Sequence, residues 1–149
     1  PASPRLAVGS FLTRSNMRTP PTVEIRKTIR GSLPRIPFAE LARVVLGESY
    51  ELSLVVCGDT LSRRMNKKYR KKAYAPNVLS FPLAGHEGEI FLNVRKAERE
   101  AKIFNIPVRD RIAHLFVHGC FHLKGLGHGK QMEKLEESVL KKFGYHVDA

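Results

Sequence analysis

The spacing of apolar residues divides the chain into alternating strands and helices. Residues 22–28 alternate apolar with polar side chains, which predicts a half-buried strand. Residues 51–57 have a continuous apolar run at their centre, which predicts a strand that is buried on both faces. Residues 77–82 and 88–93 favour two more strands, and their short connection predicts a hairpin with Pro82 at a strand end or a sheet edge.

Apolar residues at intervals of three and four predict helices in the other segments. These helices cover residues 38–47, 58–69, 94–105, 107–124 and 131–143. The helix that starts at Pro107 is apolar on every side, which is typical of a helix in the middle of a domain. In the last helix the predicted packed face consists of Met132, Leu135, Val139, Leu140 and Phe143. The whole pattern predicts an α/β (α+β) fold, in which a mixed sheet of about four strands surrounds a central buried helix.

Length and composition favour one folded unit with a separate amino-terminal segment. The 149 residues, 42% of them hydrophobic, are enough for a single core, and we expect residues 22–149 to form one domain. Residues 1–21 contain four prolines, three arginines and no acidic residue. We expect this segment to be a disordered arm, an upstream translated or appended stretch, or an organelle-targeting sequence.

The positive charge of the chain indicates what kind of partner this domain binds. The chain has 26 Lys and Arg against 14 Asp and Glu, a formal net charge of +12. This balance favours a polyanionic partner, above all nucleic acid, although basic charge also serves plain solubility. Seven of the ten residues from Arg63 to Lys72 are cationic, which is either a solvated helix face or a surface that follows backbone phosphates.

The cysteines and the lack of long apolar runs favour a reducing compartment. Cys57 lies in an apolar strand and Cys120 in the apolar helix, so both are predicted to be small buried hydrophobic residues. No membrane span and no secretory signal is expected. We therefore expect a cytoplasmic protein, or an organellar matrix or stromal one if residues 1–21 are a targeting sequence.

Three histidines have the spacing of a metal site. His118 and His122 are four residues apart and would share one face of a helix, and Gly125 allows a turn that brings His128 to the same point. Three protein ligands leave the fourth position of a zinc ion open, as in catalytic rather than structural sites. The alternative is an accidental spacing of surface and core histidines.

The ligand spacing also matches that of the metzincin proteases, His-Glu-x-x-His-x-x-Gly-x-x-His. In that motif the general base is the glutamate directly after the first histidine. This chain has Gly119 at that position, which disfavours a zinc peptidase.

Four collinear motifs resemble the YbeY family of zinc-dependent endoribonucleases, which are linked to rRNA maturation and ribosome quality control. The motifs are Met65-Asn66-x-x-Tyr69-Arg70, Asn77-Val-Leu-Ser-Phe-Pro82, Gly88-Glu-Ile-Phe-Leu92 and His114-x-x-x-His118-Gly-x-x-His122-x-x-Gly125-x-x-His128. The resemblance runs from about residue 51 to residue 144, and it identifies residues 22–149 as a YbeY-like metal-hydrolase domain.

The resemblance implies a single-strand-specific endoribonuclease that acts in rRNA maturation, at the 3′ end of 16S-type rRNA, and in ribosome quality control. One Zn²⁺ per chain would be held by the three spaced histidines, and Arg70 would be a catalytic residue near the metal. Lys67 and Lys71 would help Arg70 to hold the RNA backbone. His114 would be a catalytic proton relay, a partner of a metal ligand, or a core histidine. The expected partners are single-stranded RNA or rRNA and the ribosomal small subunit or its assembly proteins.

The chain also departs from the family pattern around the third histidine. Gly127 stands where the family commonly has aspartate, and Gly129-Lys130-Gln131 replaces a commonly acidic run. Pro76 stands where the family often has threonine. These changes leave open which group acts as general base, and whether zinc hydroxide or the RNA 2′-hydroxyl is the nucleophile. The alternative function is a ribosome- or RNA-binding assembly factor that zinc merely stabilises.

Overall fold

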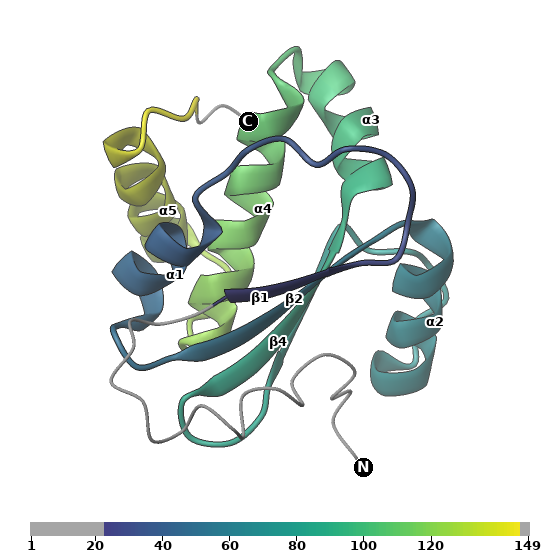
Figure 1. Cartoon of the computed structure of the whole chain (residues 1–149), viewed down its shortest axis with the longest axis horizontal. Coiled ribbons are helices and arrows are strands. Elements are labelled where there is room, and N and C mark those ends of the chain that lie inside the picture. The colour runs from purple at the N-terminus through teal and green to yellow at the C-terminus, as the bar shows by residue number, and fades with distance from the viewer. Residues whose placement is uncertain (1–22, 147–149) are drawn as a thin grey trace.

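The computed structural model describes residues 23–146, and they form a four-stranded sheet with five helices (Figure 1). The expectations for residues 1–21 fall outside this range. In chain order the elements are β1 (Val23–Lys27), α1 (Phe38–Leu46), β2 (Glu51–Cys57), α2 (Asp59–Arg70), β3 (Val78–Pro82), β4 (Glu87–Asn93), α3 (Val94–Phe104), α4 (Val108–Leu123) and α5 (Lys130–Lys142). All the strands and helices predicted from the spacing of apolar residues are present, and none of their ends is shifted by more than one residue.

The sheet is mixed, as predicted. Its strand order is β1-β2-β4-β3, in which β1, β2 and β4 are parallel and β3 is antiparallel to β4. The predicted hairpin is the β3–β4 pair, and Pro82 is the last residue of the edge strand β3, where its missing N–H costs no ladder hydrogen bond.

Residues of β2 pack alternately on the two faces of the sheet, so this strand is buried on both, as predicted. Leu52, Leu54 and Val56 belong to the larger core, which they share with α1, α4 and α5. Val55 and Cys57 belong to a smaller core beside α2. Figure 1 shows the same division, with α2 on one side of the sheet and α1, α4 and α5 on the other.

Helix α4 is the central buried element. Ten of its sixteen residues are buried, and α1, α3 and α5 all pack against it. Phe116 on its inner side meets Phe38 of α1 edge to face, with ring centroids 4.8 Å apart. Because α4 is packed on its other sides, the side chains on its one solvent-facing side are held in fixed positions.

Gly119 allows α4 to lie close to the sheet. A Cβ atom at this position would be 2.9 Å from Ser80 Oγ and 3.2 Å from Ile90 Cδ1. Ser80 Oγ donates a hydrogen bond to the Gly119 carbonyl oxygen at 2.9 Å. Because a side chain at 119 would point into the sheet, the chain has no room there for the metzincin glutamate, which strengthens the argument against a peptidase.

One prediction about packing was wrong. The apolar spacing predicts Leu135 on the packed face of the last helix, but the residue is 38% exposed. Its neighbour Glu136 takes the buried position between Met132 and Val139, and only 4% of it is exposed. Between residues 23 and 146 no helix has the length and apolar character needed to cross a membrane.

Candidate metal centre

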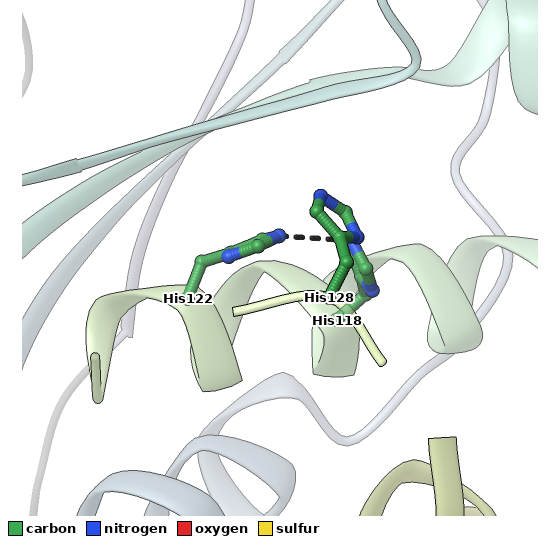
Figure 2. Close-up of side chains that lie close together, drawn as sticks. All are labelled: His118, His122 and His128. Carbon is green, nitrogen blue, oxygen red and sulfur yellow. Dashed lines mark hydrogen bonds between the residues drawn. The ribbon is translucent and has the colours of Figure 1, made fainter. Parts of the chain in front are cut away.

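Three histidines from two segments converge at the open face of α4. His118 and His122 lie one turn apart on this helix, and α4 ends immediately afterwards at Leu123. Gly125, with a φ of 104°, turns the chain back, so that His128 faces the other two (Figure 2). One nitrogen from each of the three rings lies within 4.8 Å of the others. The predicted convergence is therefore present, and the cluster could hold a metal ion.

The distances and the donor set fit a metal bound by imidazole. The Nε2 atoms of His118 and His122 face each other at 3.1 Å. Two nitrogen ligands of a tetrahedral zinc lie about 3.3 Å apart, because each zinc–nitrogen bond is about 2.0–2.1 Å long. The centroids of the two rings are 4.5 Å apart and their planes are nearly perpendicular, at 88°.

Hydrogen bonds fix the tautomers of both helical histidines. His122 Nδ1 lies 3.0 Å from the carbonyl oxygen of Leu126, which can only accept, so this nitrogen carries the proton. His118 Nδ1 donates in the same way to Oε2 of Glu136 at 2.5 Å. Both rings are thereby held with an unprotonated Nε2 toward the centre, which is the form that binds a metal.

Burial and neighbouring groups also favour a neutral His122 and an ionised Glu136. Burial, together with the nearby rings of His118 and His128, lowers the pKa of His122 and favours its neutral form. Burial would raise the pKa of Glu136, but hydrogen bonds from His114 and His118 outweigh it and lower this pKa to about 2. Glu136 is therefore a carboxylate that two imidazoles stabilise.

His114 lies one turn before His118 on α4 and is not part of the metal cluster. Its Nε2 lies 3.0 Å from Oε1 of Glu136, the carboxylate oxygen that His118 does not use. Glu136 thus joins His114 to a candidate ligand. His114 is thus an indirect partner of His118, through Glu136, and its role as a proton relay stays a prediction.

Glu136 is a site residue that the motifs in the sequence do not single out. The signal was an acidic residue four positions after Met132 and four before Leu140, on a helix whose other buried residues are apolar. A carboxylate at such a position needs a partner in the protein interior, because burying an unpaired charge is costly. Helix α4 supplies that partner with two histidines on its facing side.

Two hollows in the surface meet at the histidines, and the first is basic. Its volume is about 580 Å³, and among the described residues no carboxylate lines it. Its lining residues are Arg70, Tyr74, Pro76, Asn77, Val78, Ser80, Lys96, His118, His122 and His128. Arg70 lines this hollow together with the three histidines, and its catalytic role stays a prediction. Lys96 was not expected here, and it comes from the first turn of α3.

The second hollow is mainly acidic. Its volume is about 520 Å³ and it shares Asn77, His118 and His128 with the basic hollow. Its remaining lining residues are Arg111, His114, Leu115, Gly129, Met132, Glu133, Glu136 and Glu137. Arg111 is paired with Glu100 at 2.9 Å, so this hollow carries little uncompensated positive charge.

The other predicted site residues lie nearby but do not line either hollow. Lys67 is exposed on α2, and Lys71 follows the end of that helix in a left-handed conformation with a φ of 58°. Gly127, where the family commonly has an aspartate, has open space around its Cα, since a Cβ atom would meet nothing within 4 Å.

The fold and the site define a class: an α/β protein with a candidate three-histidine metal centre on the open face of its central helix, between a basic and an acidic hollow. A family model described as "Endoribonuclease YbeY" matches residues 19–144. The chain belongs to the YbeY family.

Individual relatives agree with this assignment. The chain is 38% identical over 103 residues to "Endoribonuclease YbeY" of Polynucleobacter asymbioticus, which covers 63% of this chain and 66% of that protein. For the protein of the same name from Methylocella silvestris the identity is 38% over 110 residues, and the coverage is 66% and 62%. The matched part thus spans slightly less than two thirds of these two relatives. The relative from Alkaliphilus metalliredigens is 33% identical over 138 residues, with coverage of 82% and 89%.

A solved structure shows the same fold. The solution structure of TM1509 from Thermotoga maritima superposes with a TM-score of 0.59 at 21% sequence identity. The match covers 82% of this chain and 91% of that one. At this identity the likeness establishes the fold alone.

Proposed function

We propose that this protein is a zinc-dependent endoribonuclease that cleaves single-stranded RNA and acts in rRNA maturation, at the 3′ end of 16S-type rRNA, and in ribosome quality control. The observation that carries the proposal is the convergence of three imidazoles beside a hollow lined by Arg70 and Lys96. The relatives named as endoribonucleases support the reaction class.

His118, His122 and His128 would hold the metal, one ion per chain. Three neutral nitrogen ligands with a fourth position left for water or substrate are typical of catalytic zinc. When bound, zinc would polarise a phosphate oxygen and lower the pKa of a bound water. The protein's own residues then have to bind the RNA, neutralise charge and handle protons.

Arg70 would hold the phosphodiester group. Its side chain is exposed, it lines the basic hollow with the three histidines, and no ion pair to another described residue occupies its guanidinium. A free guanidinium fork can donate two parallel hydrogen bonds to phosphate oxygens and stabilise charge that develops during cleavage. Lys67 and Lys71 on the same helix end would add positive charge along the RNA backbone.

His114 and Glu136 would act on the opposite side of the centre. Glu136 keeps His118 in its metal-binding tautomer and orients His114 through its other oxygen. His114 lines the acidic hollow, where it would take up or release a proton during turnover. This assignment gives the chain a titratable group near the metal although Gly127 replaces the family's aspartate.

The expected partners follow from the same surface. Single-stranded RNA or rRNA, presented by the ribosomal small subunit or its assembly proteins, would be drawn to a chain with a formal charge of +12. Cys57 and Cys120 are buried and unpaired, which fits a reducing compartment such as the cytoplasm or an organellar matrix.

Cleavage of a labelled single-stranded RNA tests the proposal. We expect the zinc-loaded protein to cut it, and His118→Ala to lose both bound zinc, measured by mass spectrometry, and cleavage. The control is His86→Ala, because His86 is exposed and lines neither hollow. Equal cleavage by all three proteins would reveal a contaminating nuclease and sink the proposal. Zinc binding with no cleavage, and a lower melting temperature after chelation, would favour an assembly factor that zinc stabilises.

A further inference from the structure

An exposed aromatic ring stands beside the candidate metal centre. Tyr74 lies in the loop between α2 and β3, and 54% of the residue is exposed. It lines the same basic hollow as Arg70 and the three histidines. A ring of this size would stabilise the fold more if it were buried. Its exposure beside a candidate site therefore indicates a role in binding.

The backbone that carries this ring is held firmly. Three successive carbonyl oxygens of the loop accept hydrogen bonds from side chains of other elements. Asn66 Nδ2 donates to Tyr74 O at 2.9 Å, and Lys96 Nζ donates to the Ala75 carbonyl oxygen, also at 2.9 Å.

The third carbonyl is held from two sides. Pro76 O accepts from Ser62 Oγ at 2.7 Å and from Asn93 Nδ2 at 3.2 Å. Ser62 and Asn93 are both buried, and so is the Asn66 that holds the preceding tyrosine. The main chain of the loop is therefore fixed by buried groups, while the ring itself projects to solvent.

The surroundings of the ring have the chemistry of a site for single-stranded nucleic acid. Lys96 Nζ lies 5.8 Å from the centre of the Tyr74 ring, and Arg70 lines the same hollow. Proteins that bind single strands combine positive charge for the phosphates with aromatic side chains on which bases stack. A base that is already paired and stacked in a duplex is not available to such a ring.

We propose that Tyr74 is a stacking platform for one base of single-stranded RNA, next to the phosphate that Arg70 holds. This inference rests on the proposed function, since it assigns a base-binding subsite to the same RNA. The ring would select single strands over duplexes and would fix the position of the nucleotide relative to the histidines.

Equilibrium binding of a short 2′-O-methylated RNA oligonucleotide with a fluorescent label tests the subsite, and a denaturing gel checks that the RNA stays intact. We expect Tyr74→Ala to bind about tenfold more weakly, which corresponds to the loss of one stacked base. Tyr74→Leu, which keeps apolar area without an aromatic face, should lose nearly as much, and Tyr74→Phe should bind like the unchanged protein. Ile103→Ala is the control, because Ile103 is 77% exposed and lines neither hollow.

An abasic version of the oligonucleotide isolates stacking from charge. We expect the unchanged protein and Tyr74→Ala to bind it equally, because no base remains for the ring. An equal loss for abasic and normal RNA, a Phe variant as weak as the Ala variant, or no binding by the unchanged protein would each overturn the inference. Cleavage is measured separately on unmodified RNA, so a protein that binds through Tyr74 without cutting would refute the nuclease and leave the subsite standing.

Discussion

The basic and acidic hollows share His118, His128 and Asn77, yet they differ in what their charged groups do. On the acidic side Glu136 is buried and both of its oxygens bond to histidines. On the basic side Arg70 has no ion pair among residues 23–146, and Tyr74 projects beside it. In the acidic hollow the charge of Glu136 holds a candidate ligand, and in the basic hollow the charge of Arg70 stays available.

This difference predicts the direction from which a polyanion approaches. The carboxylate of Glu133 would repel RNA and the cations of the basic hollow would attract it, whereas Glu137 is paired with Lys141 at 3.2 Å. The metal centre would then be reached from one side and supported from the other. Substitutions on the basic side should therefore change RNA binding or cleavage. Substitutions on the acidic side should change metal affinity.

The largest effect is expected from Arg70→Ala. Cleavage of single-stranded RNA should fall about 100-fold, because a charge-stabilising donor is lost from the reacting phosphate. Bound zinc should stay the same, since Arg70 forms no contact with the histidines that the structure records. The matched control is Arg63→Ala, another exposed arginine of α2 that lines neither hollow. A comparable loss in both variants would mean that only the overall charge of α2 matters.

The second effect concerns the acidic side. Glu136→Gln should weaken zinc binding by about 10- to 100-fold, as expected when the partner that orients a histidine ligand is lost. Competition with a chromophoric chelator measures the affinity. Glu133→Gln is the control, because Glu133 lines the same hollow but forms no hydrogen bond to a histidine in the structure. If Glu136→Gln keeps its zinc affinity and instead loses RNA binding, the assignment of the two sides is wrong.

Sequence patterns predicted most of the fold and the three converging histidines because both depend on local spacing. The period of apolar residues reports which face of a helix or strand is buried, and His118 and His122 share a face through their separation of four. Gly125 marked the turn that brings His128 back, and its φ of 104° is one that side chains rarely adopt.

The parts of the site that the sequence did not predict depend on packing between distant elements. Glu136 meets His114 and His118 only because α5 packs on α4, and Leu135 was chosen for the packed face since hydrophobicity alone favours it. Lys96 reaches the basic hollow because α3 starts beside the loop that carries Tyr74. The spacing along α5 marks Glu136 as a buried acid but does not name its partners, and no pattern near Lys96 indicates its approach to the loop.

A third prediction uses the acid stability of the zinc-free protein. Since the pKa of Glu136 lies near 2 in the folded protein and at 4.5 ordinarily, its carboxylate stabilises the fold fully above pH 4.5. That contribution is lost as the pH falls from 4.5 toward 2. Allowing for solvent screening, we expect a loss of about 1 kcal/mol, or about 4 °C in melting temperature. Glu136→Gln should lack this part of the acid-induced decrease, whereas Glu133→Gln should retain it.

The smallest effect is expected from Lys67→Ala combined with Lys71→Ala. Both lysines are exposed at the end of α2 and line neither hollow, so each would contact RNA only through backbone phosphates. The plot of log binding constant against log salt should become shallower by about 1.4, or about 0.7 for each phosphate contact on a single strand. Zinc affinity and the cleavage rate at saturating RNA should not change.

The control for these lysines is a pair with the same charge elsewhere, Lys102→Ala with Lys142→Ala, on α3 and α5. Losing two positive charges from any part of the surface weakens long-range attraction, but only a direct phosphate contact changes the number of released counterions. An equal change of slope in both double variants would therefore show that α2 attracts RNA without touching it. The basic side would then be reduced to Arg70, Lys96 and Tyr74, the residues that line the hollow itself.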